Sequence, residues 1–329
     1  MKPVLAILSA GIAGGLALLS PVRGQDPAPA PPAPDAEHAT ILGYDEDRTE
    51  RMTVPVSIGG TGPYRFIVDT GAERTVISSD LADRLNLGPG LTSVVHSMTE
   101  VSRIATVVIP ELQVGGKSVL GINAPALQRR NLGAEGMLGV DSLQSQRVAF
   151  DFVNQEMTIT PSRRREEKWP EGTIVVTARN RFGHLVLVDA EVDGQKVWVV
   201  IDTGSQVTVA NNALRRKLER RGRLGATLPV EMLSVTGGRI TADQTKVKLI
   251  RIGGVDIVDM PIAFADVHPF RKLNLMHRPA ILLGMDALKL FKRVSVDFAN
   301  RRVKILVPVR SERQLETQMA RAERARRGG

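Results

Sequence analysis

Short runs of β-branched and aromatic residues, separated by glycine, proline, asparagine or aspartate, fill the chain between residues 48 and 309. Examples are "TVPVSIGGTGPYRFIV" and "HLVLVDAEVDGQKVWVVI". Such runs predict strands joined by hairpins, with tight turns at "GG" and "VDG". Two segments have helical spacing and a terminal glycine: "SSDLADRLNLG", capped at Ser79 or Asp80, and "NNALRRKLERRG". The pattern therefore predicts an all-β protein with a few short helices.

The pattern also repeats along the chain. "FIVDTGAERTVIS" recurs 133 positions later as "VVIDTGSQVTVAN", and "GMLGVDSL" recurs as "ILLGMDAL". "LQVGGKSV" corresponds to "IRIGGVDI", and "VAFDFVNQEMTI" corresponds to "VSVDFANRRVKI". Four matched blocks in one order predict a duplicated β domain, with lobes at residues 48–161 and 173–309. The charged stretch at residues 162–172 is then the linker.

The first residues predict an exported protein. Residues 1–24 have one lysine, Lys2, then an apolar run and small residues before Gln25, which is typical of a cleaved signal peptide. An uncleaved anchor is the alternative, but the apolar run has 16 residues and a membrane span needs about 20. Residues 25–47 begin with a stretch rich in proline and alanine and predict an extended spacer. We therefore expect a periplasmic or secreted protein of a bacterial envelope, with no stable membrane span after cleavage.

Composition and charge narrow the partners. The 329-residue chain has no cysteine, so it folds without disulfides or a thiolate metal site. Its net charge of +9 becomes 42 − 35 = +7 without Lys2 and Arg23. Residues 310–329 supply six arginines and three glutamates but no aromatic residue that could stack on a base, so we expect a solvated basic tail and no nucleic-acid partner. A weaker reading is an envelope protein that uses this tail to hold an anionic surface.

The twin loop is the strongest chemical signal. In each copy three apolar residues run into Asp-Thr-Gly, which predicts an aspartate at the end of a buried strand. If the lobes meet about a pseudo-twofold axis, Asp69 and Asp202 come together. Two carboxylates about 3 Å apart repel by roughly 5 kcal/mol at an effective dielectric constant of 20, or about four pKa units. The pair would then share one proton over a wide pH range.

These motifs resemble the aspartic protease clan of pepsins and retroviral proteases, and "VDTGAERTVI" is especially similar to the retroviral type. The resemblance covers residues 48–309. It implies two homologous retropepsin-like closed-barrel lobes within one chain, a monomer that acts as an internal pseudo-dimer. It also implies an aspartic endopeptidase that binds a polypeptide extended in the interlobe cleft and needs neither cofactor nor metal.

The resemblance assigns roles to individual residues. Asp69 and Asp202 match the catalytic aspartates that activate a water. The residues that match the surroundings of this pair are Thr70, Gly71, Ala72, Thr203, Gly204, Ser205, Gly139 and Gly284. The threonines brace one loop against the other, and Gly139 and Gly284 end the apolar pairs that support the loops. Because Ser205 has a hydroxyl and Ala72 has none, we expect Asp202 to hold the charge and Asp69 the proton.

Other signals are weaker. The resemblance implies flap hairpins, for which "SMTEVSRIA" and "SVTGGRITA" are the candidates, although the first has no glycine and the pepsin flap tyrosine has no match. The five histidines lack metal-ligand spacing. "GGKS" lacks the first glycine of a phosphate-binding loop and fits a hairpin turn better. Four recurring carboxylates are interpreted as structural groups bonded to backbone turns: Asp141, Asp151, Asp286 and Asp297. The main alternative function is a non-catalytic periplasmic peptide-binding protein with the same groove.

Overall fold

The computed structural model describes most of the predicted lobes. The described residues are 40–43, 45–46, 51–115, 117–163, 168–181 and 184–308. The predicted signal peptide and basic tail lie outside them, as does most of the predicted spacer. Within the spacer range, β1 (Thr40–Gly43) pairs with β12 (Glu156–Pro161), and β2 (Asp45–Glu46) pairs with β3 (Met52–Ile58). Sheet structure therefore begins at Thr40, before the predicted lobe boundary at residue 48.

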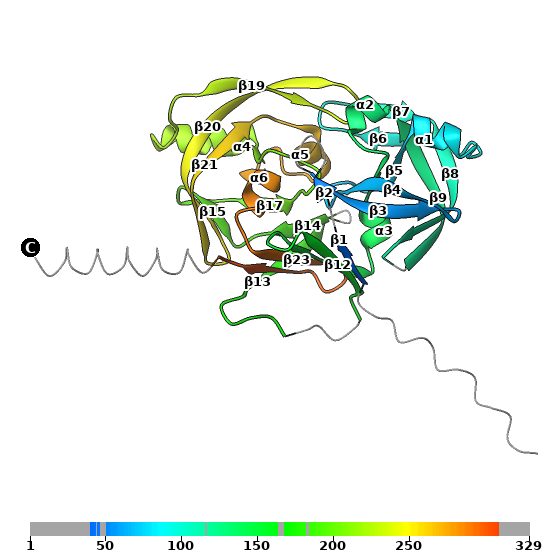
Figure 1. Cartoon of the computed structure of the whole chain (residues 1–329). Helices are drawn as coiled ribbons and strands as arrows, with labels where there is room; N and C mark the ends of the chain where they lie inside the picture. Colours follow the sequence, from blue (N-terminus) through cyan, green and yellow to red (C-terminus); the bar gives the residue numbers. More distant parts are fainter. Residues whose placement is uncertain are drawn as a thin grey trace, which may run out of the picture. The chain divides into compact units, whose positions relative to one another are not determined.

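The first lobe is a closed barrel of six strands (Figure 1). Around the ring they are β3, β4 (Thr61–Val68), β10 (Gly136–Leu138), β5 (Val76–Ser78), β9 (Lys117–Leu127) and β8 (Thr106–Val114), and β8 pairs again with β3. The parallel pairs β4–β10 and β5–β9 alternate with antiparallel ones. A separate hairpin, β6 (Ser93–His96) and β7 (Val101–Ile104), projects from this barrel.

The second lobe repeats this order, with its first strand divided in two. The strands are β14 (His184–Leu187), β15 (Ala190–Val192), β16 (Gln195–Lys196), β17 (Trp198–Ile201), β18 (Val209–Ala210), β19 (Leu228–Leu233), β20 (Arg239–Ile252), β21 (Val255–Phe264) and β22 (Ala280–Leu283). β14 pairs with β17, while β15 pairs with β20 at the other side of the ring. The prediction of a mostly β fold with two related lobes is confirmed.

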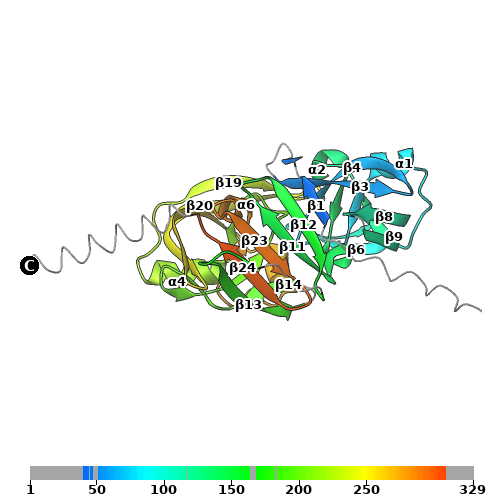
Figure 2. The same cartoon turned by 60° about the horizontal axis from the view of Figure 1, so that its bottom comes forward.

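A third layer of strands joins the lobes. Figure 2 looks onto β1, β12, β11 (Gln146–Asp151), β23 (Arg293–Asp297), β24 (Arg302–Leu306) and β13 (Ile174–Arg181), in that order. The central pair crosses between lobes, because β11 of the first lobe lies antiparallel to β23 of the second. A buried ion pair links the same two strands, with Arg147 Nε 3.1 Å from Asp297 Oδ2. The lobes are therefore held together by backbone hydrogen bonds of this sheet as well as by contacts at the Asp-Thr-Gly loops.

The helices are short, and the boundaries of the first differ from those predicted. They are α1 (Ser79–Arg84), α2 (Arg129–Leu132), α3 (Val140–Leu143), α4 (Asn212–Arg220), α5 (His268–Lys272) and α6 (Met285–Leu288). Ser78 caps α1 in place of Ser79 or Asp80, because β5 ends at Ser78 and the helix starts at the next residue; the Ser78 hydroxyl accepts from Leu81 N at 3.3 Å. α1 ends at Arg84, before the terminal glycine of the predicted segment, and Asn86, with φ of 49°, takes the left-handed conformation after it.

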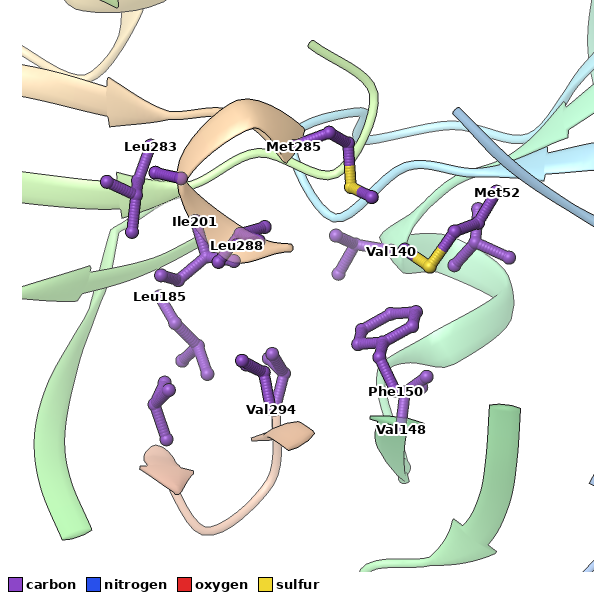
Figure 3. Close-up of a cluster of buried hydrophobic side chains, with 14 of the residues drawn as sticks. Met52, Val140, Val148, Phe150, Leu185, Ile201, Leu283, Met285, Leu288 and Val294 are labelled. Carbon is purple, nitrogen blue, oxygen red and sulfur yellow. The ribbon is translucent and has the colours of Figure 1, made fainter. Parts of the chain in front are cut away.

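One buried hydrophobic cluster contains side chains from both lobes (Figure 3). Its labelled members are Met52, Val140, Val148 and Phe150 from the first lobe and Leu185, Ile201, Leu283, Met285, Leu288 and Val294 from the second. Full burial of each large apolar side chain stabilises the folded state by about 1.5–3 kcal/mol relative to leaving it exposed. The cluster extends from the sheet that joins the lobes (the joining sheet) to the strands that precede the aspartate loops. It therefore fixes the position of both loops relative to the joining sheet.

Candidate active site

Each predicted aspartate directly follows a strand whose last three residues are buried. β4 ends at Val68, and the next residue, Asp69, donates its backbone N–H to Leu138 O at 3.0 Å. In the second lobe β17 ends at Ile201, and Asp202 N donates to Leu283 O at 3.0 Å. The loops therefore start from equivalent points in the two barrels.

The two threonines bond each loop to the opposite lobe. Thr70 Oγ1 donates to Ile201 O at 2.9 Å, and Thr203 Oγ1 donates to Val68 O at 2.6 Å. Each hydroxyl also accepts from the backbone N–H of the other threonine, at 3.0 and 3.3 Å. Both side chains are buried, so these four reciprocal bonds form away from water, where an unmade hydrogen bond is costly.

The loop glycines let the aspartates approach each other. A Cβ on Gly71 would lie 2.7 Å from Oδ1 of Asp202, and a Cβ on Gly204 would overlap the carboxylate of Asp69. Within each loop the glycine N–H donates to its own aspartate, Gly71 to Asp69 at 2.7 Å and Gly204 to Asp202 at 3.1 Å. Only a residue without a side chain fits between a carboxylate and the facing loop.

The two carboxyl groups form one electrostatic unit, which we call the aspartate pair. Burial raises the pKa of Asp202 from 3.8 to about 8, helped by the charge of Asp69 and a side-chain hydrogen bond with it. Burial also raises the pKa of Asp69, while backbone N–H donors from Gly71 and Ala72 and the charge of Arg51 oppose the rise. Burial and the mutual repulsion of the two charges therefore favour one retained proton on the pair, and the backbone donors favour Asp69 as the ionised member.

The hydrogen bonds around the pair favour the opposite charge assignment to the one expected from the sequence. The Ser205 hydroxyl donates to Val207 O at 2.8 Å, so only the backbone N–H of Ser205 reaches Asp202, at 3.2 Å. Asp69 receives the shorter backbone bonds, 2.7 Å from Gly71 and 3.0 Å from Ala72. Asp69 is thus the better stabilised anion, for a reason that depends on the serine rotamer and not on the residue type.

The carboxylates that recur in both lobes are hydrogen bonded to backbone groups of turns, as expected from the sequence, and two of them bond to the residues that follow the aspartate loops. Asp141 accepts from the N–H and hydroxyl of Thr75, and Asp286 does the same for Thr208. Each threonine hydroxyl in turn accepts from a predicted glycine, Gly139 N at 3.2 Å and Gly284 N at 3.1 Å. A Cβ on either glycine would collide with backbone atoms after the loop. Asp151 and Asp297 similarly accept from backbone N–H groups of the turns that follow them.

Comparison with known proteins places the chain in a family. Residues 54–142 and 188–287 each match the family described as aspartyl protease, one match in each lobe. The chain belongs to the aspartyl protease family. Comparison with curated protein sequences gave no match. The family supports a protease-type function, and the two matches fit a duplicated, retropepsin-like aspartyl protease.

The aspartate pair of this aspartyl protease lies in a cavity of about 380 Å³ lined by both lobes. Apolar side chains of both lobes contribute to the lining: Val76 and Met137 in the first lobe, Val200, Val207 and Leu282 in the second. Met137 and Leu282 stand at equivalent positions of the repeat. A cavity of this size is typical of a site that binds a small molecule or a few residues of a peptide. We call it the cleft.

The two predicted flap segments are the turns and second strands of hairpins that border the cleft. Val94, Val95 and His96 of hairpin β6–β7 line it, as do Met232 and Leu233 of hairpin β19–β20. The hairpin tips touch each other, because Thr99 packs directly against Gly238. The glycine-free first segment thus still forms a turn, in which Ser97 Oγ accepts from the N–H of Glu100 at 3.2 Å.

Several charged residues of the cleft were missed in the sequence. Arg51 and His184 line it and stand at matching places, each 18 residues before an aspartate of the pair (51 to 69, 184 to 202). Glu73 forms an ion pair with Lys272 of the other lobe and lies 4.0 Å from His184 Nε2. Burial lowers the pKa of His184, and the charge of Glu73 opposes this. The equal spacing of Arg51 and His184 before the two Asp-Thr-Gly motifs was the signal in the sequence that could have identified these two residues.

The described residues lack two other kinds of feature. Within them, no group of three histidine, cysteine or acidic side chains is placed to hold a metal ion. Nor does any of the described helices have the length and apolar character needed to cross a membrane.

Proposed function

We propose that this protein is an aspartic endopeptidase that hydrolyses peptide bonds with a water activated by Asp69 and Asp202. The observation that carries the proposal is the aspartate pair itself: two carboxyl groups, one from each lobe, each lie against the facing loop glycine inside a cleft formed by both lobes. A pair with separated protonation states supplies a base and an acid at the same pH.

The chemistry follows from the proton assignment. Ionised Asp69 takes a proton from water, the water oxygen attacks the peptide carbonyl carbon, and Asp202 gives its proton to the carbonyl oxygen. In the tetrahedral intermediate a hydroxyl proton returns to Asp202, Asp69 protonates the departing nitrogen, and the C–N bond breaks. The products are a carboxylic acid and an amine, and no covalent bond to the protein forms.

The substrate we propose is a polypeptide bound in an extended conformation. Hairpins β6–β7 and β19–β20 border the cleft with strand backbone, to which a peptide can hydrogen bond as an added strand. Because one chain supplies both aspartates, a monomer would suffice. We further propose export, since residues 1–24 have the charge, apolar run and small residues of a signal peptide.

The test is cleavage of a diverse peptide library by residues 25–329, beside Asp69→Asn and Asp202→Asn and with Asp83→Asn as the matched control on the exposed face of α1. We expect the control to cleave like the native protein and both pair variants to lose at least 100-fold in kcat/KM. Peptides that are retained without being cut at any pH would instead favour the peptide-binding alternative.

The pH profile gives a second, independent check. Asp202 acts in its protonated form, so activity is lost as pH rises through about 8. On the acid side activity is lost once Asp69 also becomes protonated. We expect a bell-shaped kcat/KM profile whose alkaline limb lies near pH 8; an alkaline limb below pH 5 would contradict the assignment of the proton to Asp202.

A further inference from the structure

Hairpin β6–β7 of the first lobe is attached to a helix of the second. His268, the first residue of α5, donates its backbone N–H to Met98 O at the hairpin tip, at 2.9 Å. Its ring also meets the hairpin, with Nε2 2.6 Å from Nδ1 of His96. The ring centroids are 4.8 Å apart and the rings are within 16° of parallel. Because Pro269 and Lys272 of α5 line the cleft, these contacts close it on one side.

The remaining contacts of the hairpin tip do not depend on protons. Met98 packs against the buried apolar cluster of the second lobe, and Thr99 packs against Gly238 of the other hairpin. Ser97 bonds within its own turn. The histidine pair is therefore the titratable contact between this hairpin and the second lobe in the described part of the chain.

A bond between two imidazole nitrogens needs one N–H donor and one free lone pair. Two neutral rings meet this condition, and so does a pair that has gained one proton. When both rings are protonated, all four ring nitrogens carry hydrogen, no acceptor remains, and two positive charges face each other at hydrogen-bond distance. The contact then changes from attractive to repulsive.

We propose that His96 and His268 form a proton-sensitive latch that holds hairpin β6–β7 closed over the cleft at neutral pH and releases it in acid. The latch concerns motion of the hairpin, so it holds equally for a protease and for a peptide-binding protein.

The surrounding charges set the pH at which the latch opens. His96 faces Lys272 and Glu73, and His268 faces His96, Arg271 and Lys272. Burial is the main cause that lowers the pKa of both rings from 6.5. The charge of Lys272 lowers the pKa of His96 further, while Glu73 opposes this. The pKa of His268 is lowered further by the charge of His96. A lowered pKa keeps the second proton off until the pH falls below the ordinary histidine value. The latch is therefore intact at pH 7 and is lost as the solution becomes acidic.

The absence of cysteine allows a direct measurement, because two introduced cysteines are the only sites for spin labels. Glu100→Cys places one label at the exposed hairpin turn, and Arg216→Cys places the other on the exposed face of α4 in the second lobe. Pulsed electron paramagnetic resonance then gives the distance distribution at pH 7.5, 6.0 and 4.5. We expect one closed distance at pH 7.5 and a longer one in acid, with the open-to-closed ratio rising about tenfold per pH unit below the second protonation.

Amide variants separate the latch from general acid effects. His96→Asn sets an amide where Nδ1 lies, and His268→Gln sets one where Nε2 lies; an amide can accept from a protonated ring or donate to a neutral one. We expect both variants to stay closed at pH 4.5 and His96→Ala to be open at pH 7.5. The exposed-histidine control His277→Asn should open in acid like the native protein. The latch is wrong if the native hairpin does not move in acid, if the amide variants open as the native protein does, or if His96→Ala remains closed.

Discussion

Replacing Asp202 by asparagine changes the stability of the protein in a way that depends on pH. The asparagine amide can still donate to Asp69 and accept from Gly204, so the shape of the site is retained. What is removed is the proton that the native pair takes up on folding. We therefore expect the variant to be more stable than the native protein at neutral pH, and to lose this advantage in acid.

The magnitude follows from the pKa of Asp202, about 8 in the folded protein against 3.8 in the unfolded chain. A group whose pKa is raised by folding contributes stability that is fully present below 3.8 and is lost as pH rises to about 8. One proton gives a slope of about 1.4 kcal/mol per pH unit, so the penalty at pH 7 is about 4 kcal/mol. This is an upper limit, because Asp202 is partly exposed to the cleft and solvent screens part of its charge.

Urea denaturation at pH 5.0, 6.0 and 7.0 measures the effect. The free energy of unfolding of Asp202→Asn minus that of the native protein should increase by up to about 3 kcal/mol from pH 5 to pH 7. Asp83→Asn, at an exposed position on α1, should follow the native protein at each pH. A difference between Asp202→Asn and the native protein that stays constant with pH would contradict this prediction, since it would mean that folding takes up no proton at the pair.

Three other changes test the supports of the site. Thr203→Val removes a buried hydroxyl with two partners across the lobes and should cost about 2–3 kcal/mol in urea denaturation; a cost below about 0.5 kcal/mol would contradict the bracing role. Gly204→Ala should abolish cleavage of library peptides, because its Cβ overlaps Asp69, and full activity would show that the loops can separate freely. Arg147→Met should cost about 3–5 kcal/mol by leaving Asp297 buried without its ion-pair partner, and restoration by Asp297→Val in the same chain would confirm that cause.

Local patterns were enough for much of the fold. The apolar run before each Asp-Thr-Gly predicted a strand buried on both faces, and β4 and β17 end in such runs. The Gly-Gly and Asp-Gly pairs predicted hairpins, and Asp193 and Gly194 have the positive φ values, 46° and 76°, of a tight hairpin turn. These predictions succeeded because a strand buried on both faces and a turn with positive φ each restrict which residues can occupy them.

Predictions that depended on a single rotamer or on one residue of register were less successful. The Ser205 hydroxyl bonds to a carbonyl two residues ahead, which reversed the expected charge asymmetry of the pair. Ser78 caps α1 because β5 ends there, and sequence preference alone could not choose among three adjacent capping residues. The joining sheet was not predicted, because its central pair brings together strands from different lobes.

The amino-acid sequence alone was enough to show that the chain contains two copies of one β lobe and that each copy presents an aspartate on a glycine loop. It could do so because strand periodicity and turn chemistry act over a few residues. Tertiary structure decided which groups meet across the lobes: Thr70 with Thr203, Glu73 with Lys272, and His96 with a partner 172 residues away. It also decided which aspartate keeps the proton, because a pKa depends on burial and on every donor and charge within a few ångströms, wherever they lie in the chain.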